Sequence, residues 1–442
     1  MDETKPEVTT RSDLARVRVG LLGCGTVGEA LVRLLREETA QITARTGLVL
    51  EVTRVAVRDL SRDRGLGLPS SAFSDDAASV VNDPDIDIVV EVIGGVDPPR
   101  QLVLDSLSAG KPVVTANKEL LARCGAELFS AADRAAVDLL FEAAVAGGIP
   151  FVRPLRESLL GEPIDRVMGI VNGTTNYILT RMTEDAVQYD AALEEAQRLG
   201  YAEADPTADV EGFDARAKAA IIASIAFGAR VASDDVHCEG ISSLTADDIA
   251  SARRRGYVIK LLAVAERVAD SVAVRVHPAL VPHHHPLASV RGSFNAVFVQ
   301  GRAVGDLMFY GRGAGGLPTA SAVLGDLIDA AVNLQKGSSA SLGALADIPL
   351  VPIEDLVSEY SVRIDVADRP GVLAVIAGVF ASHDVSIRSM EQEGLGDEAR
   401  LMFITHLARE RDLRATLGEL ADLDIVSGVG NALRLVPEEE EV

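Results

Sequence analysis

Asp214 and Lys218 could perform acid–base chemistry, because a carboxylate and an ammonium lie one helical turn apart. They are separated by four positions, so on a helix they share one face. The alanine and isoleucine residues around them predict a partly dry setting. Burial lowers the pKa of a lysine, whereas a nearby carboxylate keeps it charged. An ammonium placed there could protonate the alkoxide that forms when a carbonyl is reduced. The spacing alone leaves a second interpretation open, an ordinary exposed ion pair on a helix surface.

A second lysine lies where open α/β sheets bind ligands. Lys118 follows an apolar run at 111–116 that predicts a buried strand, and ligands bind beyond the carboxyl ends of such strands. Lys118 is therefore a second candidate for the site.

Cys124 has no histidine near it in sequence to activate a thiol nucleophile, so we expect it to be a packing residue.

A glycine-rich turn near the N-terminus could hold a phosphate. The motif GCGTVG follows an apolar run at 17–22 and precedes a helical pattern at 29–38. In this context the first glycine allows a tight turn, the second lets the backbone approach a pyrophosphate, and the third packs helix on strand. The cofactor-binding candidates are Gly23, Gly25, Thr26, Val27 and Gly28. We expect a dinucleotide here; the alternative is a glycine-rich turn in an ordinary α/β domain.

The end of the next predicted strand, 50–58, bears on which dinucleotide is bound. Arg58 could pair with a ribose 2′-phosphate, whereas the adjacent Asp59 would favour a free 2′-hydroxyl. Because both residues are present, we expect NADP(H) to be preferred and NAD(H) to be usable.

Alternating strands and helices must position these residues. In the first third of the chain, stretches rich in alanine and leucine separate apolar runs at 17–22, 50–58, 87–93, 111–116 and 138–144. This alternation predicts a doubly wound sheet of the Rossmann type, hence an α/β protein. Later segments predict helices at 175–182, 189–199 and 213–231, then β-like runs between 257 and 304. A glycine-rich loop at 311–316 precedes a helix from about Thr319, and 335–343 is small and polar.

The C-terminal segment 359–435 reads as strand, helix, strand, strand, helix, strand, the order of a ferredoxin-like unit. The predicted organisation is a disordered tail at 1–15, a dinucleotide-binding domain at 16–148 with a return helix near 312–333, an α+β catalytic and dimerisation domain at 149–311, a linker at 334–356, a regulatory domain at 357–436 and an acidic tail at 437–442.

Composition narrows the classes of partner. The net charge of −24 disfavours nucleic acid and anionic membrane surfaces as partners. The three cysteines are far apart, which argues against a disulfide framework or a zinc site and fits a reducing compartment. No uncharged apolar run reaches the roughly 18 residues of a membrane span, so we expect a cytoplasmic protein. Consecutive histidines at 283–285 favour a solvated loop over a metal site.

Longer motifs resemble those of one enzyme family, the homoserine dehydrogenases. They are VNGTTNYIL at 171–179, GYAEADPTADVEGFDARAK at 200–218, TANK ending at Lys118, and GRGAGGLPTA from Gly311. They stand in the family's order and are far more specific than the glycine-rich turn. The resemblance covers residues 17–435. It implies reversible, NAD(P)-dependent reduction of L-aspartate 4-semialdehyde to L-homoserine, in threonine, methionine and isoleucine biosynthesis.

The same resemblance implies roles for individual residues. Lys218 would donate the proton, Asp214 would bind the reacting end of the substrate and orient Lys218, and Lys118 would lie near substrate and nicotinamide, whose C4 supplies the hydride. The remaining implied contacts are Glu203 with the substrate α-ammonium, Asp209 with the substrate, and the backbones of Gly200 and Gly315 with cofactor or substrate.

Two further segments resemble family features. The loop at 142–150 resembles one that holds a monovalent cation, sodium, mainly by backbone carbonyls, with candidate ligands Glu142, Val145, Gly147 and Ile149. From the residues alone, a glycine-rich hinge is the better interpretation. The run DRPGVL at 368–373 resembles the turn of ACT domains, which pair edge to edge and bind amino acids. The implied effector is threonine; the alternative is a purely oligomerising unit. We expect a homodimer or homotetramer.

Two other functions stay open. One is another Rossmann oxidoreductase acting on an amino-acid aldehyde or amine, which a comparison of aldehyde substrates would separate. The other is a catalytically silent amino-acid sensor, which would be expected to lack the candidate catalytic residues that this sequence retains.

Overall fold

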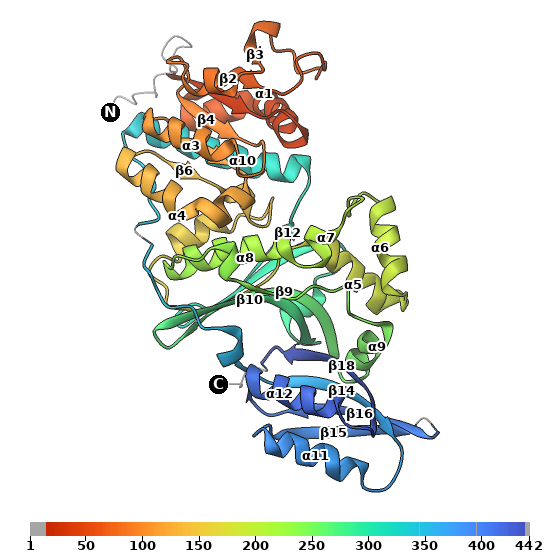
Figure 1. Cartoon of the computed structure of the whole chain (residues 1–442). Coiled ribbons are helices and arrows are strands. Elements are labelled where there is room, and N and C mark those ends of the chain that lie inside the picture. Colours follow the sequence, from red (N-terminus) through yellow and green to blue (C-terminus); the bar gives the residue numbers. More distant parts are fainter. Residues whose placement is uncertain (1–14, 344, 395, 438–442) are drawn as a thin grey trace, which may run out of the picture. The chain divides into compact units, whose positions relative to one another are not determined.

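The computed structural model describes residues 15–343, 345–394 and 396–437, which divide into two units (Figure 1). The first unit holds the described residues up to Gly161 together with Ser224–Ser233 and Gly311–Asp347. The second holds Glu162–Ala223, Asp234–Tyr310 and the described residues from Ile348 onwards. The predicted tails at 1–15 and 437–442 lie outside the described residues except at two positions. One of these, Ala15, already belongs to a strand.

A parallel sheet of six strands forms the centre of the first unit, in the order β3-β2-β1-β4-β5-β6. This order is that of a dinucleotide-binding fold, so the predicted Rossmann architecture is confirmed. The strands are β1 (Ala15–Leu22), β2 (Leu48–Ala56), β3 (Phe73–Ser74), β4 (Ile88–Glu91), β5 (Val113–Thr115) and β6 (Leu139–Leu140). All four residues of β4 are buried, as expected of a strand with both faces covered.

Helices cover this sheet and share its core. They are α1 (Thr26–Thr46), α2 (Ala77–Val81), α3 (Pro99–Ser108), α4 (Lys118–Ala135) and α10 (Gly316–Lys336). The last of these returns from much later in the chain, and its Val323 and Leu327 lie in one apolar cluster with Leu31 of α1. Because α10 extends to Lys336, its last turn includes the first residues of the linker predicted at 334–356.

The second unit is built on a sheet of ten strands. Its main path runs β12-β11-β7-β9-β10-β18-β14-β16-β15, and β8 pairs with β10 beside that path. The strands of the middle segment are β7 (Ile164–Ile170), β8 (His237–Cys238), β9 (Tyr257–Val268), β10 (Ser271–Pro282), β11 (Phe294–Gly301) and β12 (Gly305–Arg312). Its helices are α5 (Gly173–Asp185), α6 (Tyr189–Arg198), α7 (Thr207–Val210), α8 (Phe213–Phe227) and α9 (Ala246–Arg254).

The C-terminal segment has the predicted strand–helix order and its own apolar core, in which Tyr360, Phe380 and Phe403 are fully buried. Its elements are β14 (Tyr360–Ala367), α11 (Val372–Ser382), β15 (Ile387–Gly394), β16 (Glu398–Thr405), α12 (Glu410–Ala421) and β18 (Val426–Leu435), with a small pairing of β13 (Val357–Ser358) and β17 (Ala408–Arg409). Parallel pairing of Ala279 with Arg434 and of Leu280 with Leu435 joins it to β10.

Several predicted element ends are wrong, for local reasons. The helix predicted at 213–231 ends at Phe227, because Gly228 takes the left-handed conformation (φ +61°) that closes a helix. The strand predicted at 138–144 ends at Leu140, since Glu142–Ala144 form a 3₁₀ turn. Among the described helices, none is both long and apolar enough to span a bilayer.

Candidate functional site

The glycine-rich turn has the geometry that each of its glycines was predicted to provide. At Gly23 φ is +93°, and a Cβ there would lie 2.8 Å from the carbonyl oxygen of Val92. A Cβ on Gly28 would lie 2.6 Å from the carbonyl oxygen of Gly23, so helix α1 packs tightly on the turn. A Cβ on Gly25 would meet no atom within 4 Å, which leaves room for a ligand at the first turn of α1. Helix N-termini present N–H groups without intrahelical acceptors, so this turn fits a pyrophosphate.

The loop that leads into α10 lies against the same turn. A Cβ on Gly316 would lie 2.9 Å from the Cγ2 atom of Thr26, and Gly315 has a φ of +124° that favours glycine. On its other side the loop contacts the predicted cation loop, since a Cβ on Gly147 would lie 2.2 Å from the carbonyl oxygen of Gly313. Glycine-specific backbone therefore brings Gly315, Thr26 and Gly147 into one region of the first unit.

The segment after β2 gathers arginines near the glycine-rich turn. Arg58 is exposed, and Asp59 next to it accepts hydrogen bonds from the backbone and hydroxyl of Ser61. Arg64 donates to the carbonyl oxygen of Cys24 at 3.3 Å, within the turn itself. Arg62 pairs with Glu29 in the first turn of α1 at 2.8 Å. Sequence reasoning missed Arg62 and Arg64, because their proximity to the turn depends on how the loop folds back.

A buried carboxylate that sequence reasoning also missed orders the loops beside Lys118. Glu91, at the end of β4, is fully buried, and its Oε1 accepts the N–H groups of Ile93 (2.8 Å) and Gly94 (3.2 Å). Its Oε2 accepts the hydroxyl of Thr115 at 2.6 Å, and that hydroxyl oxygen accepts the N–H of Asn117. Asn117 caps α4, whose first residue is the half-buried Lys118. Glu91, an acid near the end of the apolar run 87–93, was the sequence signal that could have indicated this buried carboxylate.

In the second unit, the predicted pair forms a buried hydrogen-bonded network. Lys218 donates to Oδ2 of Asp214 at 2.7 Å and to the carbonyl oxygen of Val171 at 2.6 Å. Both side chains belong to residues that are 8 % exposed, so this is no exposed surface ion pair. Asn172, which caps α5, donates its amide to Asp209 at 2.6 Å and to Asp214 at 2.9 Å. We gave Asn172 no role from sequence, although its place before Gly-Thr-Thr predicts a helix cap.

The other predicted substrate contacts lie on the adjoining loop. Glu203 and Gly200 are exposed, and Asp209 is half-buried. The hydroxyl of Thr174, in the first turn of α5, donates to the carbonyl oxygen of Tyr201 at 2.6 Å and so ties this loop to the network. The second unit therefore brings Asp209, Asp214 and Lys218 together, with Glu203 on a solvent-facing neighbour.

The predicted cation loop offers oxygens mainly from its backbone. The carboxylate of Glu142 is engaged by the N–H groups of Val152 (2.7 Å) and Arg153 (2.8 Å), so its main-chain carbonyl is the group left to bind an ion. The N–H of Glu142 donates to Asp326, whose pKa burial raises to about 7. Carbonyl oxygens suit a hard monovalent cation. Across the described ranges, no group of three or more histidine, cysteine, aspartate and glutamate side chains could hold a metal.

The interpretation of 283–285 as a solvated loop is wrong for one of its three histidines. His285 is buried, and its Nδ1 accepts the N–H of Leu287 at 3.1 Å while its ring packs on Phe298. It therefore caps a helical turn, whereas His283 and His284 are exposed.

Family models match three consecutive parts of the chain. The models are those of the homoserine dehydrogenase NAD-binding domain at residues 23–142, homoserine dehydrogenase at 150–328 and the ACT domain at 360–424. A homoserine dehydrogenase of Corynebacterium glutamicum is 51 % identical over 425 residues, which cover 95 % of each chain. The chain belongs to the homoserine dehydrogenase family.

Solved structures of homoserine dehydrogenases share the fold. The crystal structure of the enzyme from Thiobacillus denitrificans has a TM-score of 0.90 and 44 % identity, and covers 95 % of this chain and 98 % of that one. A hyperthermophilic archaeal homoserine dehydrogenase in complex with NADPH has a TM-score of 0.62 and 29 % identity, over 72 % of this chain and 98 % of that one. The predicted fold class and family are thus confirmed, with NAD-binding, catalytic and ACT domains in that order.

Proposed function

We propose that this homoserine dehydrogenase reduces L-aspartate 4-semialdehyde to L-homoserine, reversibly, with a bound nicotinamide dinucleotide. The observation that carries the proposal is the buried network of Lys218, Asp214 and Asn172. It joins a proton donor to two carboxylates in a chain whose relatives bear this enzyme's name. In the cell, the product would supply threonine, methionine and isoleucine synthesis.

Lys218 is the proposed acid of the reaction. A bound cofactor supplies a hydride from nicotinamide C4 to the aldehyde carbon. The carbonyl oxygen gains negative charge as its π bond breaks, and the Lys218 ammonium stabilises that charge and protonates the oxygen. The lysine is left neutral and regains a proton from solvent. Asp214 holds Lys218 in place and favours its charged form before the transfer.

The remaining residues have proposed roles in binding. Glu203 receives the substrate α-ammonium, which its exposure allows before the substrate arrives. Asp209 and Asp214 are fixed by the Asn172 amide and face the reacting end. Gly200 approaches substrate or cofactor by its backbone. Gly23, Gly25, Thr26, Val27, Gly28 and Gly315 would hold the dinucleotide, with Lys118 near its nicotinamide.

The central test is homoserine-dependent reduction of NADP⁺ and NAD⁺ by the purified chain, followed at 340 nm, with related amino alcohols as competing substrates. Lys218→Ala should lower turnover by at least about 100-fold, the usual contribution of a general acid, while NADP⁺ binding persists. Lys336→Ala, which removes an exposed lysine from the last turn of α10, is the matched control. Wild-type turnover in Lys218→Ala would refute the assignment.

NADP(H) is the proposed preferred cofactor, and NAD(H) is proposed to be usable. Support comes from Arg62 and Arg64, which lie at the turn, from the exposed Arg58 after β2, and from the engagement of Asp59 by Ser61. Arg58→Ala should raise the Michaelis constant for NADPH by about tenfold or more, because a charge-assisted hydrogen bond is worth roughly 1.5–3 kcal/mol, and should leave that for NADH nearly unchanged. Arg45→Ala, at the opposite end of α1, controls for loss of a surface charge. Equal effects on both cofactors would remove Arg58 from this role.

A structural sodium ion and an amino-acid effector complete the proposal. The carbonyl oxygens of Glu142, Val145, Gly147 and Ile149 would hold the ion, and exchange of sodium for tetramethylammonium should then lower the melting temperature.

Threonine is the proposed effector at the ACT domain. The chain is proposed to form a homodimer or tetramer, which light scattering measures. Among the described residues, β15 ends the sheet order, and its outer edge is the proposed place for a second copy.

A further inference from the structure

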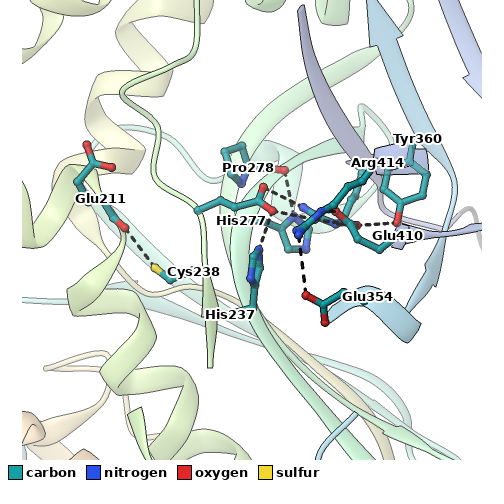
Figure 2. Close-up of polar contacts among 11 residues, drawn as sticks. Glu211, His237, Cys238, His277, Pro278, Glu354, Tyr360, Glu410 and Arg414 are labelled. Atoms are coloured by element: carbon teal, nitrogen blue, oxygen red, sulfur yellow. Dashed lines mark hydrogen bonds and ion pairs between the residues drawn. The ribbon is translucent and has the colours of Figure 1, made fainter. Parts of the chain in front are cut away.

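Arg434, in the last strand of the ACT domain, is the centre of a buried ionic cluster. Its side chain is 5 % exposed and binds Glu410 of α12 through Nε (3.1 Å) and Nη2 (2.9 Å). The same Glu410 oxygen accepts the hydroxyl of Tyr360 at 2.8 Å, a contact drawn in Figure 2. These contacts fix the guanidinium firmly to the ACT core.

The other side of this guanidinium binds the catalytic part of the same unit. Arg434 donates from Nη1 to one oxygen of Glu239 (2.9 Å) and from Nη2 to the other (2.7 Å), a two-point contact of fixed orientation. Glu239 follows β8, and its N–H donates to the carbonyl oxygen of Val276 in β10. Burial alone would raise the pKa of Glu239, but hydrogen bonds from His237 and Arg434 outweigh it and lower that pKa.

Residues 238–241, which include Glu239, contact the turn that joins α7 to α8. The thiol of Cys238 donates to the carbonyl oxygen of Glu211 at 3.2 Å (Figure 2). The N–H of Ile241 donates to the carbonyl oxygen of Val210 at 2.8 Å. A Cβ on Gly240 would lie only 2.4 Å from the carbonyl oxygen of Val210. Residues 238–241 are therefore in direct contact with residues 210–212.

The turn at 210–212 lies between the two proposed substrate carboxylates. Asp209 precedes it at the end of α7 and Asp214 follows it in the first turn of α8. Asn172 binds both carboxylates, so a displaced turn would change their distance from the Asn172 amide and from Lys218. Within the described residues, a continuous series of contacts thus runs from the ACT strand β18 to the network around Lys218.

We propose that Glu239 and Arg434 are positioning residues for the substrate carboxylates, and that through this pair the ACT domain sets the affinity of the catalytic domain for its amino-acid substrate. The inference rests on the proposed function of Asp209 and Asp214. Neither Glu239 nor Arg434 touches substrate. The pair acts by holding residues 238–241 against the 210–212 turn. Since coupling between sites is reciprocal, substrate bound to these carboxylates also stabilises the pair.

Glu239→Gln is the primary test, because it keeps the shape of the side chain and removes its charge. The Michaelis constant for homoserine should rise at least about fivefold, the lower end of typical coupling between sites, while that for NADP⁺ stays unchanged. Arg434→Lys should also raise the homoserine constant, although it weakens the contact with Glu410 as well. The double variant should be no worse than Arg434→Lys alone, because Arg434→Lys already breaks the contact that Glu239→Gln weakens.

The matched control is Glu266→Gln. Glu266 lies on β9 of the same sheet, its side chain is 12 % exposed, and it binds two arginines, Arg166 at 2.7 Å and Arg275 at 2.6 Å. A general loss of stability from a broken buried pair would appear in this variant too. The homoserine constant should stay at the wild-type value in Glu266→Gln.

Gly240→Ala reaches the same turn without changing a charge, and serves if Glu239→Gln fails to fold. Its Cβ would push on Val210 and should also raise the homoserine constant. A wild-type homoserine constant in folded Glu239→Gln, or equal rises in Glu239→Gln and Glu266→Gln, would overturn the inference. Loss of homoserine oxidation by the wild-type chain would instead overturn the proposed function, so the two failures are distinguishable.

Discussion

Two buried lysines of the second unit are held in different electrostatic settings. Lys218 has a carboxylate partner in Asp214, whereas Lys260 of β9 is 2 % exposed and donates to neutral oxygens, the Asn176 amide (2.9 Å) and the Val290 carbonyl. Burial lowers the pKa of Lys260 from 10.5 to about 8, and the charges of Glu184 and Arg291 act on it in opposite directions. Because Asn176 lies four positions after Asn172 and belongs to α5, Lys260 supports the helix whose N-cap residue, Asn172, binds Asp209 and Asp214.

Lys260 should make the protein more stable as the pH rises above 8. Below pH 8 both states carry the ammonium, and the folded state bears its burial cost. Between about 8 and 10.5 the folded state loses the proton first, so stability rises by up to about 3 kcal/mol. Lys260→Met should lack this rise. Urea unfolding midpoints at pH 8 and pH 10 measure it, with exposed Lys336→Met as control. The same increase with pH in Lys260→Met and in the wild type would show that another group is responsible.

At the scale of residues, the sequence predicts pairs that are close along the chain and misses those joined by folding. Asp214 and Lys218 were predictable because four positions on a helix fix their proximity. Their burial was predictable from the apolar neighbours. Glu91 and Thr115 lie on separate strands, and their contact depends on the pairing of β4 with β5. Likewise, the contact of Asn172 with Asp209 requires α5 and α7 to meet.

At the scale of elements, the loops after β4 and β5 depend on one carboxylate. Glu91→Ala would leave the N–H groups of Ile93 and Gly94 without their acceptor, at a cost of about 1–3 kcal/mol each. These loops adjoin the glycine-rich turn, where Gly23 packs on Val92. The dissociation constant of NADPH, read from its fluorescence, should therefore rise about tenfold or more.

Glu91→Gln is the control for this prediction. Its amide oxygen can still accept the two N–H groups, so most of the cofactor affinity should persist. Wild-type NADPH binding in Glu91→Ala, together with an unchanged melting temperature, would show that the loops do not need this acceptor.

Helix and strand order was predictable from periodicity, whereas element ends were set by single residues. The alternation of apolar runs predicted the parallel sheet, whereas the helix predicted at 29–38 runs from Thr26 to Thr46 as α1. The end of α8 at Phe227 depends on the left-handed Gly228, and the early end of β6 on a 3₁₀ turn that periodicity does not reveal. Helix α9 was not predicted, because its short length leaves little periodicity to detect, although Thr245 and Asp248 form a capping box at its start.

At the scale of the whole molecule, the sheet of the second unit joins the catalytic and ACT strands. Within the described residues, the strand pairing at this junction consists of two residue pairs of β10 and β18, which lie more than 150 positions apart in the chain. Such a pairing cannot be read from local pattern, so the sequence predicted two domains and left their connection open. The Glu239–Arg434 contact spans the same junction, and we propose that it couples an ACT ligand to the catalytic domain.

Threonine at several millimolar should therefore raise the Michaelis constant for homoserine to a limiting value that more threonine does not exceed. A ligand that competes for the substrate site would raise that constant without limit, whereas an ACT ligand would act from a second site with a finite coupling, typically about 5–150-fold. Initial rates over a grid of threonine and homoserine concentrations distinguish the two, with valine as the control amino acid. Unchanged rates in both reaction directions would show that threonine is not the effector and would favour a purely oligomerising ACT domain. If threonine inhibits the wild type, Glu239→Gln should respond less, because the contact that carries the effect has been weakened.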